Sequence, residues 1–265
     1  MSETLMESLI ELKNVTVNFQ EHISLDEVSL TIPIKKSTVI MGPSGSGKSM
    51  LLKVAASIVP PDSGKVYLQG RNYQRFTEKQ VLEFRRRSGF MFQDAALWSN
   101  KSVYDNLALP IQFHYPGREH EQIDRRVRGL LARVGLEDSL DLRPAALSTG
   151  EQKMVSFLRA IVLEPEVLFL DQPTPSIDYV MLEKMMRLIR ELKEKGCTII
   201  AVTHDAHLTS MIANYLIVLK NGQVLEAADT SEIRRSANRE VLEILTEVLS
   251  EAATYDTDIL DLLQE

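Results

Sequence analysis

Residues 42–49 (GPSGSGKS) are the stretch whose residue types and spacing point most specifically to chemistry. They match the pattern G-x-x-x-x-G-K-[ST], in which main-chain N–H groups converge on phosphate oxygens. Lys48 would reach the β- and γ-phosphates, and the hydroxyl of Ser49 would ligate Mg²⁺. The predicted nucleotide-binding residues here are Gly42, Pro43, Ser44, Gly45, Ser46, Gly47, Lys48, Ser49 and Met50. The sequence therefore predicts a nucleoside triphosphate site, which we favour over a chance glycine-rich turn.

Four more motifs follow at intervals along the chain. Asp171 ends the apolar run 167–170 (VLFL), the place where a second Mg²⁺ anchor is expected in this chemistry. Residues 147–152 read LSTGEQ and precede a predicted helix. Gln93 lies between two predicted subdomains, and His204 follows another apolar run.

Together with the phosphate loop, these motifs resemble those of the ATP-binding-cassette (ABC) ATPases. The resemblance runs from about residue 9 to about residue 228, and the motifs occur in the family's order. It implies an α/β fold: a P-loop NTPase (RecA-like) core with an antiparallel β subdomain, a helical subdomain insertion and a C-terminal helical tail. The implied cofactors are ATP and Mg²⁺.

The resemblance also implies roles for residues around each ATP. Phe19 would stack on adenine, in place of the more usual tyrosine. Gln93 would touch Mg²⁺ and the attacking water while sensing a transmembrane partner, and His204 would hydrogen-bond the γ-phosphate. Ser49, Gln93 and Asp171 are thus the implied metal residues.

A second copy of the chain is implied by the remaining motif residues. Ser148, Thr149 and Gly150 would contact the γ-phosphate held by the other protomer, and Asp178 would cross the dimer interface. A head-to-tail homodimer with two ATPs at its interface follows from this composite site.

The sequence departs from the family pattern at several of these positions. The signature usually reads LSGGQ, so Thr149 adds a β-branched side chain near ATP and Glu151 adds a negative charge. Pro175 and Ser176 also differ from the usual loop before Asp178.

The largest departure is Gln172, which stands where the family has a glutamate that polarises the attacking water. A glutamine amide can orient water but cannot accept its proton at neutral pH. Gln172 is either an engineered isosteric replacement that traps an ATP-loaded closed dimer, or the natural residue of a slow or inactive site. The intact Lys48, Ser49, Asp171 and His204 favour the first interpretation. Both predict ATP binding and dimerisation with reduced turnover.

The elements that must position these residues are readable from their periodicity. Alternating or apolar segments predict strands over residues 9–19, 25–32, 39–41, 65–68, 167–170 and 198–202, and a hairpin with a type I′ turn over 215–225. Helices are predicted over residues 50–57, 77–87, 122–134 and 180–194, and again beyond residue 229. We expect an ATPase domain over 1–228, with a helical insertion at about 94–155, and a tail over 229–265.

Composition bounds the partners and the compartment. The chain has 265 residues and a net charge of −7, from 30 basic and 37 acidic residues, which disfavours nucleic acid as a partner. The single cysteine, Cys197, lies in an apolar run and is expected to be a buried thiol in a reducing compartment. No apolar stretch approaches the length of a membrane span, and no signal peptide is recognisable. We expect a protein on the cytoplasmic side of the inner (plasma) membrane, attached through a permease.

The partner expectations rest on residues 93–110, which resemble the ATPases that energise Mla/Mce-type phospholipid transport. The implied partners are a permease dimer, lipid-binding proteins and a small regulatory subunit. Trp98 is either an exposed anchor for the permease or part of the helical core. Residues 255–263 either pack on their own core or dock on the other protomer. The alternative function is a soluble or scaffold ABC ATPase, for example in iron–sulfur assembly or cell-division signalling.

Overall fold

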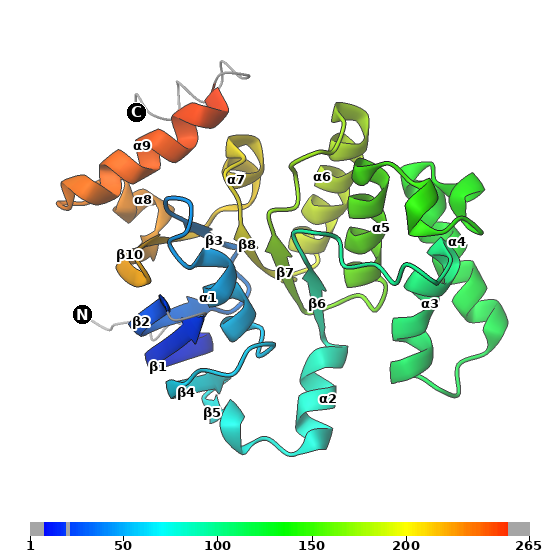
Figure 1. The fold of residues 1–265 in the computed structure, drawn as a ribbon, viewed down its shortest axis with the longest axis horizontal. Helices are drawn as coiled ribbons and strands as arrows, with labels where there is room; N and C mark the ends of the chain where they lie inside the picture. Colours follow the sequence, from blue (N-terminus) through cyan, green and yellow to red (C-terminus); the bar gives the residue numbers. More distant parts are fainter. Residues whose placement is uncertain (1–7, 20–21, 254–265) are drawn as a thin grey trace. The chain divides into compact units, whose positions relative to one another are not determined.

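The computed structural model describes residues 8–19 and 22–253, without the side chains of Phe19, His22 and residues 248–253. The chain divides into two compact units. The first holds residues 1–79 and 198–265, and the second holds residues 80–197. Figure 1 labels their helices and strands.

The first unit contains most of the strands. They are β1 (Ser8–Phe19), β2 (His22–Pro33), β3 (Thr38–Met41), β4 (Ser63–Leu68), β5 (Arg71–Asn72), β8 (Thr198–Val202), β9 (Tyr215–Lys220) and β10 (Gln223–Asp229). Its helices are α1 (Lys48–Ala55), the 3₁₀ turn η1 (Tyr73–Arg75), α7 (Ala206–Ile212), α8 (Thr230–Ile233) and α9 (Arg239–Ala253). Helix α2 (Glu78–Arg86) begins in the first unit and continues into the second.

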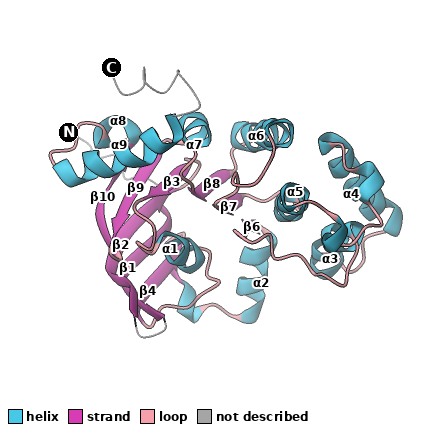
Figure 2. Ribbon diagram, turned by 45° about the horizontal axis from the view of Figure 1, so that its top comes forward, coloured by secondary structure: helices cyan, strands magenta, loops and turns pink. Residues whose placement is uncertain are grey.

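Two groups of paired strands organise the first unit. An antiparallel sheet has the order β2-β1-β4-β5, and its alternating apolar residues, such as Ile10, Leu12 and Ile32, are buried. In the other group, β3 pairs in parallel with both β8 and β9, and β10 pairs antiparallel with β9. Every residue of β3 is buried, because helices cover both faces of these strands. Helix α1 lies on one face, and α7 and α9 lie on the other (Figure 2).

The predicted hairpin is confirmed. Gln223 pairs with Lys220, so Asn221 and Gly222 form a two-residue loop, and both have positive φ (49° and 77°). Positive φ at both central residues is the requirement of a type I′ turn.

The second unit is mainly helical around two parallel strands. These are β6 (Ser88–Met91) and β7 (Val167–Asp171). Its helices are α3 (Val103–His114), α4 (His120–Val134), α5 (Thr149–Ile161) and α6 (Tyr179–Glu194), with 3₁₀ turns η2 (Glu137–Ser139) and η3 (Pro144–Ala146). Helix α5 lies at the centre, where it packs against β6, α3 and α6 (Figure 1).

The expected helix over residues 122–134 is confirmed as α4, which begins two residues earlier. Its apolar stripe is buried: Ile123, Val127, Leu130, Leu131 and Val134. One expected boundary needs correction, and one strand was missed. Helix α1 begins at Lys48, not at residue 50, because Gly47 takes the N-cap position of the helix. Strand β6 was not predicted, since its four residues (SGFM) are too few to show alternation.

Candidate functional site

The phosphate loop, residues 42–49, connects the buried strand β3 to the first turn of α1. The predicted strand–loop–helix context is therefore confirmed. Gly47 precedes the helix with φ of 99°, so the first main-chain N–H groups of α1 are directed toward the loop. A helix N-terminus carries a partial positive charge and donors without intrahelical partners, which suit a phosphate group.

Close main-chain packing explains one of the loop's glycines. Gly42 has φ of 145°, and a Cβ atom built on it would clash with the main-chain oxygen of Leu219 in β9. Only glycine therefore allows the loop to pass so close to the neighbouring strand. By contrast, a Cβ atom on Gly45 would meet no described atom within 4 Å. The loop is thus anchored at its start and open at its centre.

Lys48 and Ser46 present polar groups within this loop. The Nζ atom of Lys48 donates to the carbonyl oxygens of Gly42 (2.8 Å) and Pro43 (2.7 Å), so the buried ammonium lies over the loop. The hydroxyl of Ser46 is also buried, and it has no hydrogen-bond partner among the described residues. A buried hydroxyl without a partner is costly, so its presence here fits a loop that receives a polar ligand. The residues of the loop therefore fit a phosphate group and its metal ion.

His204 reaches the same edge of the parallel strands as the phosphate loop. Ile40 of β3 pairs with Val202 of β8, and Gly42 and His204 each follow two residues later. The carboxyl ends of parallel strands are the usual ligand-binding edge of such sheets. The next residue, Asp205, accepts from the Leu208 N–H (2.8 Å) and caps α7. The first unit thus brings His204 and the phosphate loop together at one edge.

In the second unit, Gln93 and Gln172 show the same relationship. Met91 of β6 pairs in parallel with Leu170 of β7, and the two glutamines each follow two residues later. Asp171, the residue between Leu170 and Gln172, is the last residue of β7 and is 2% exposed. Gln93, Asp171 and Gln172 therefore leave neighbouring strands at one edge.

The turn of residues 148–150, here called the signature turn, begins α5. The Ser148 hydroxyl accepts from the Glu151 N–H (3.2 Å), and the Glu151 carboxylate accepts from the Ser148 N–H (2.8 Å) and hydroxyl (2.7 Å). This is a capping box, in which two donors at the helix start are satisfied reciprocally. The negative charge noted in the sequence at Glu151 therefore stabilises the N-terminus of α5.

Residues 172–178, here called the 172–178 loop, connect Asp171 to α6. Asp178 caps α6 by accepting from the Met181 N–H (3.0 Å). The next two side chains, Tyr179 and Val180, are 75% and 63% exposed. Gln172 and Ser176 both have positive φ, at 46° and 67°.

Lys153 of α5 was missed by sequence reasoning as a site residue. Its Nζ atom donates to the main-chain oxygen of Gln172 (3.0 Å), and the side chain is 6% exposed. Burial lowers the pKa of Lys153, and the nearby charge of Asp171 opposes that shift. The signal in the sequence is a lysine placed four residues before Phe157, within the apolar face of the predicted helix.

Two other residues of α5 hold the segment that follows Gln93. The Ser156 hydroxyl donates to the Ala95 oxygen (2.7 Å), and the Arg159 guanidinium donates to Ala95 (3.0 Å) and Ala96 (2.8 Å). The two alanines both have positive φ, at 63° and 47°. Burial lowers the pKa of Arg159 to about 10, and its guanidinium lies 5.1 Å from the ring centroid of Trp98.

The predicted site residues divide between the two units. The phosphate loop, Met50 and His204 belong to the first, and Gln93, Ser148, Thr149, Gly150, Asp171, Gln172 and Asp178 belong to the second. The expected stacking of Phe19 on adenine concerns a side chain outside the described residues. In the described ranges, no group of three or more His, Cys, Asp or Glu side chains could hold a metal ion by itself.

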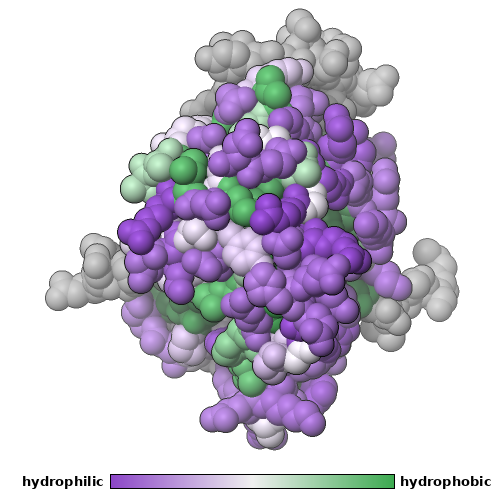
Figure 3. Space-filling view, turned by 90° about the vertical axis from the view of Figure 1, so that its right-hand side faces the viewer, coloured by the Kyte–Doolittle hydropathy of each residue, from purple (hydrophilic) through white to green (hydrophobic). Residues whose placement is uncertain are grey.

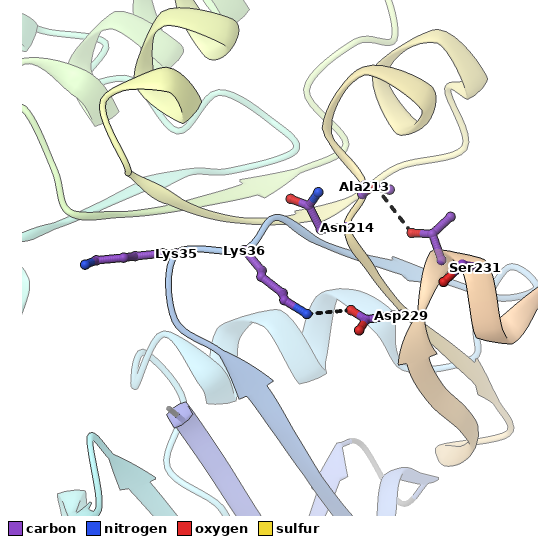
Figure 4. A pocket seen from close by; sticks show the side chains of 7 residues that line it. Lys35, Lys36, Ala213, Asn214, Asp229 and Ser231 are labelled. Atoms are coloured by element: carbon purple, nitrogen blue, oxygen red, sulfur yellow. Dashed lines mark hydrogen bonds and ion pairs between the residues drawn. The ribbon is translucent and has the colours of Figure 1, made fainter. Parts of the chain in front are cut away.

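A cavity of about 450 Å³ lies elsewhere in the first unit, at the opposite end of β3 (Figure 4). Lys36 crosses it to pair with Asp229 (2.7 Å), whereas Lys35 points away from the other labelled side chains. The remaining lining residues are Ala213, Asn214, Thr230 and Ser231. Because its charged groups are paired or directed outward, we assign it no ligand.

The surface of the second unit that carries α3 and α4 is mostly hydrophilic, with separate hydrophobic patches (Figure 3). Exposed apolar side chains of this unit include Phe113 (64%) and Trp98 (44%). Trp98 is thus partly exposed, and its covered face lies against Arg159. Within residues 8–19 and 22–253, no helix is both long and apolar enough to cross a membrane.

Comparisons with known proteins agree with this geometry. Residues 25–175 match the family described as ABC transporter. The chain is 34% identical over 230 residues to the methionine import ATP-binding protein MetN of Mannheimia succiniciproducens, covering 85% of this chain and 66% of that protein. It is 32% identical over 240 residues to the intermembrane phospholipid transport system ATP-binding protein MlaF of Haemophilus influenzae, covering 90% of each.

A solved structure is similar over most of the chain. It is the dimeric, post-hydrolysis state of the ATP-binding cassette MJ0796 bound to ADP and phosphate. The TM-score is 0.76 at 32% sequence identity, over 83% of this chain and 98% of that one. The expected P-loop NTPase fold is therefore confirmed.

Proposed function

The chain belongs to the ABC transporter family as an ATPase subunit, and on that premise we propose that its phosphate loop binds ATP together with Mg²⁺. The observation that carries the proposal is the geometry of the loop. The Lys48 ammonium lies over the main chain of the loop, and the buried Ser46 hydroxyl has no hydrogen-bond partner among the described residues. When nucleotide binds, the Lys48 ammonium would donate hydrogen bonds to phosphate oxygens in place of the Gly42 and Pro43 carbonyl oxygens.

We propose Ser49, Asp171 and Gln93 as the residues that hold Mg²⁺, through a hydroxyl, a carboxylate and an amide oxygen. Oxygen ligands of this kind, few in number and completed by phosphates, are what Mg²⁺ prefers in nucleotide sites. Bound Mg²⁺ neutralises the charge that develops on the phosphate oxygens. Asp171 supplies the only carboxylate of the three, and its burial keeps competing water from it.

The dimer proposal assigns the signature turn and Asp178 to the ATP of a second copy. Ser148 and Thr149 are exposed at the N-terminus of α5, where main-chain donors can meet a γ-phosphate. The exposed Tyr179 and Val180 beside Asp178 suit burial in an interface. The dimeric state of the similar cassette MJ0796 supports this arrangement. His204 would hydrogen-bond the γ-phosphate within its own copy.

We further propose that Gln172 makes hydrolysis slow. Its amide can orient a water molecule, but no basic oxygen stands at this position to take the proton. ATP would then close the dimer and remain bound for longer than in a relative with glutamate there.

The test compares phosphate release by the chain and by its Gln172→Glu variant at saturating ATP and Mg²⁺. A restored general base should raise the rate about 100-fold. Gln122→Glu, the same substitution on an exposed residue of α4, is the matched control and should leave the rate unchanged. Equal rates for the chain and for Gln172→Glu would contradict the assignment of Gln172.

For the cargo, we propose phospholipid, moved by a membrane permease that this chain energises from the cytoplasmic side. The chain and MlaF cover 90% of each other, whereas the chain covers only 66% of MetN. Lipid-binding and regulatory subunits are further proposed partners.

The domain limits (1–228 and 229–265, with the insertion at about 94–155) stay predictions. The docking of residues 255–263 on a second protomer concerns residues outside the described ranges.

Affinity purification of the tagged chain from detergent-solubilised membranes of its source tests the partner. A multi-span membrane protein with bound phospholipid is the expected result. A membrane protein with a methionine-binding protein would replace the phospholipid proposal by methionine import. Recovery without any membrane protein would favour the soluble or scaffold alternative.

A further inference from the structure

The 172–178 loop contains two residues whose backbones are held in an unfavourable conformation. Gln172 and Ser176 have φ of 46° and 67°, where a side chain with a Cβ atom is disfavoured. Such residues each cost on the order of 1 kcal/mol and persist only when their surroundings fix them. The loop therefore needs contacts that hold it in place.

Helix α5 supplies a contact at each of these two residues. Lys153 donates to the main-chain oxygen of Gln172 at 3.0 Å. One turn earlier, a Cβ atom on Gly150 would lie 3.0 Å from the main-chain oxygen of Ser176, so the helix packs directly against the loop there. All four residues belong to the second unit.

The contact made by Lys153 is unusual because a buried ammonium is costly unless it is paired. Lys153 is 6% exposed, and its hydrogen bond is to the main chain of Gln172. A bond from a charged donor is stronger than a neutral one. The bond holds the carbonyl group of Gln172, and with it the ψ angle of the residue that carries the side chain.

We propose that Lys153 is a positioning residue for hydrolysis: it holds the backbone at Gln172 and thereby ties that position to the helix that begins with the signature turn. The inference rests on the proposed function, because it takes position 172 as the place that orients the attacking water. A signature turn engaged with a second copy would act on position 172 through the few residues of α5 between Ser148 and Lys153.

Lys153→Met tests the proposal, since methionine keeps most of the length of the side chain and removes the donor. It is made in the chain itself and in the Gln172→Glu variant. The expected result is a fall of about 10-fold or more in the rate of phosphate release at saturating ATP, because small misplacements of reacting groups are expensive. The affinity for ATP without Mg²⁺ should stay within about 2-fold, since no contact with the phosphate loop is removed.

Lys184→Met is the matched control. Lys184 lies on α6 in the same unit and also donates to a main-chain oxygen, that of Val134 (2.7 Å), away from the nucleotide motifs. It should change thermal stability without changing phosphate release. Lys153→Arg keeps a charged donor and should recover part of the lost rate. If Lys153→Met does not fold, Lys153→Gln, which removes the positive charge and shortens the side chain, replaces it.

Hydrogen exchange of residues 172–178 gives a second readout that does not depend on hydrolysis. Exchange in this segment should rise in Lys153→Met and not in Lys184→Met. Unchanged exchange overturns the inference, and so does an unchanged rate of Lys153→Met in an active Gln172→Glu background. If no variant hydrolyses ATP, the proposed function fails, and the exchange result alone decides whether Lys153 holds the loop.

Discussion

The phosphate loop and the 172–178 loop both leave the carboxyl end of a buried strand, but they achieve their conformations differently. In the phosphate loop, the positive φ angles fall on glycines, at Gly42, Gly45 and Gly47. In the 172–178 loop they fall on Gln172 and Ser176. The first loop can adopt its shape from its own residue types, whereas the second requires a neighbouring helix to hold it.

This difference shows where each loop is vulnerable. A substitution inside the phosphate loop acts directly, by adding atoms where the main chain has no room. The 172–178 loop is vulnerable from outside, through the residues of α5 that contact it. The following three variants test this contrast, in order of expected effect.

Gly42→Ala should have the largest effect. Its Cβ atom would clash with the main-chain oxygen of Leu219, which cannot move without displacing β9. We expect a loss of about 3 kcal/mol or more in the free energy of unfolding, which is about 6 °C or more in the midpoint of thermal unfolding. Gly70→Ala is the control, since Gly70 also has positive φ (74°) but no described atom lies within 4 Å of its added Cβ. Equal effects of the two variants would contradict the close-packing explanation.

Lys48→Met should act on ligand binding more than on folding. Loss of a charged donor to phosphate removes about 2–3 kcal/mol, so the dissociation constant for ATP should rise roughly 30- to 150-fold. Titration with a fluorescent ATP analogue measures it. Lys53→Met, on the same helix outside the loop, is the control and should bind normally. Normal binding by Lys48→Met would show that the ammonium stays on the Gly42 and Pro43 carbonyls when nucleotide is present.

Ser176→Gly should have the smallest effect and the opposite sign. Glycine accepts φ of 67° without strain, so we expect a gain of about 0.5–1 kcal/mol, measured as a higher urea midpoint. Ser99→Gly, at an exposed serine without positive φ, should not stabilise the protein. A destabilised Ser176→Gly would mean that the serine side chain makes a contact that outweighs its backbone strain.

Much of the fold was predictable because its signals are local. The apolar run of β3, the glycine pattern after it and the i, i+3, i+4, i+7 stripe of α4 each lie within a short window of sequence. The Asn221–Gly222 turn is likewise determined by two adjacent residues. The same locality makes the phosphate loop recognisable from its residues alone.

Contacts between distant segments could not be predicted in this way. Lys153 and Gln172 are 19 residues apart, and Arg159 lies 63 residues from Ala96. No local pattern indicates that a lysine in an apolar helix face is aimed at a main-chain oxygen on another segment. Nor does the sequence show that Ala95 and Ala96 adopt positive φ, since alanine has no preference for that region.

Helix α5 makes contacts at both ends, from the capping box at Ser148 to the guanidinium of Arg159. Eleven residue steps along an α-helix correspond to about 16 Å. A rigid rotation of about 5° around the Ser148 end would therefore displace the Arg159 end by roughly 1.4 Å, as much as separates a good hydrogen bond from a broken one. Ala95 and Ala96, which follow Gln93, would then have to move with α5 or lose their hydrogen bonds to Arg159. A small tilt at one end of α5 would therefore make or break hydrogen bonds at the other end.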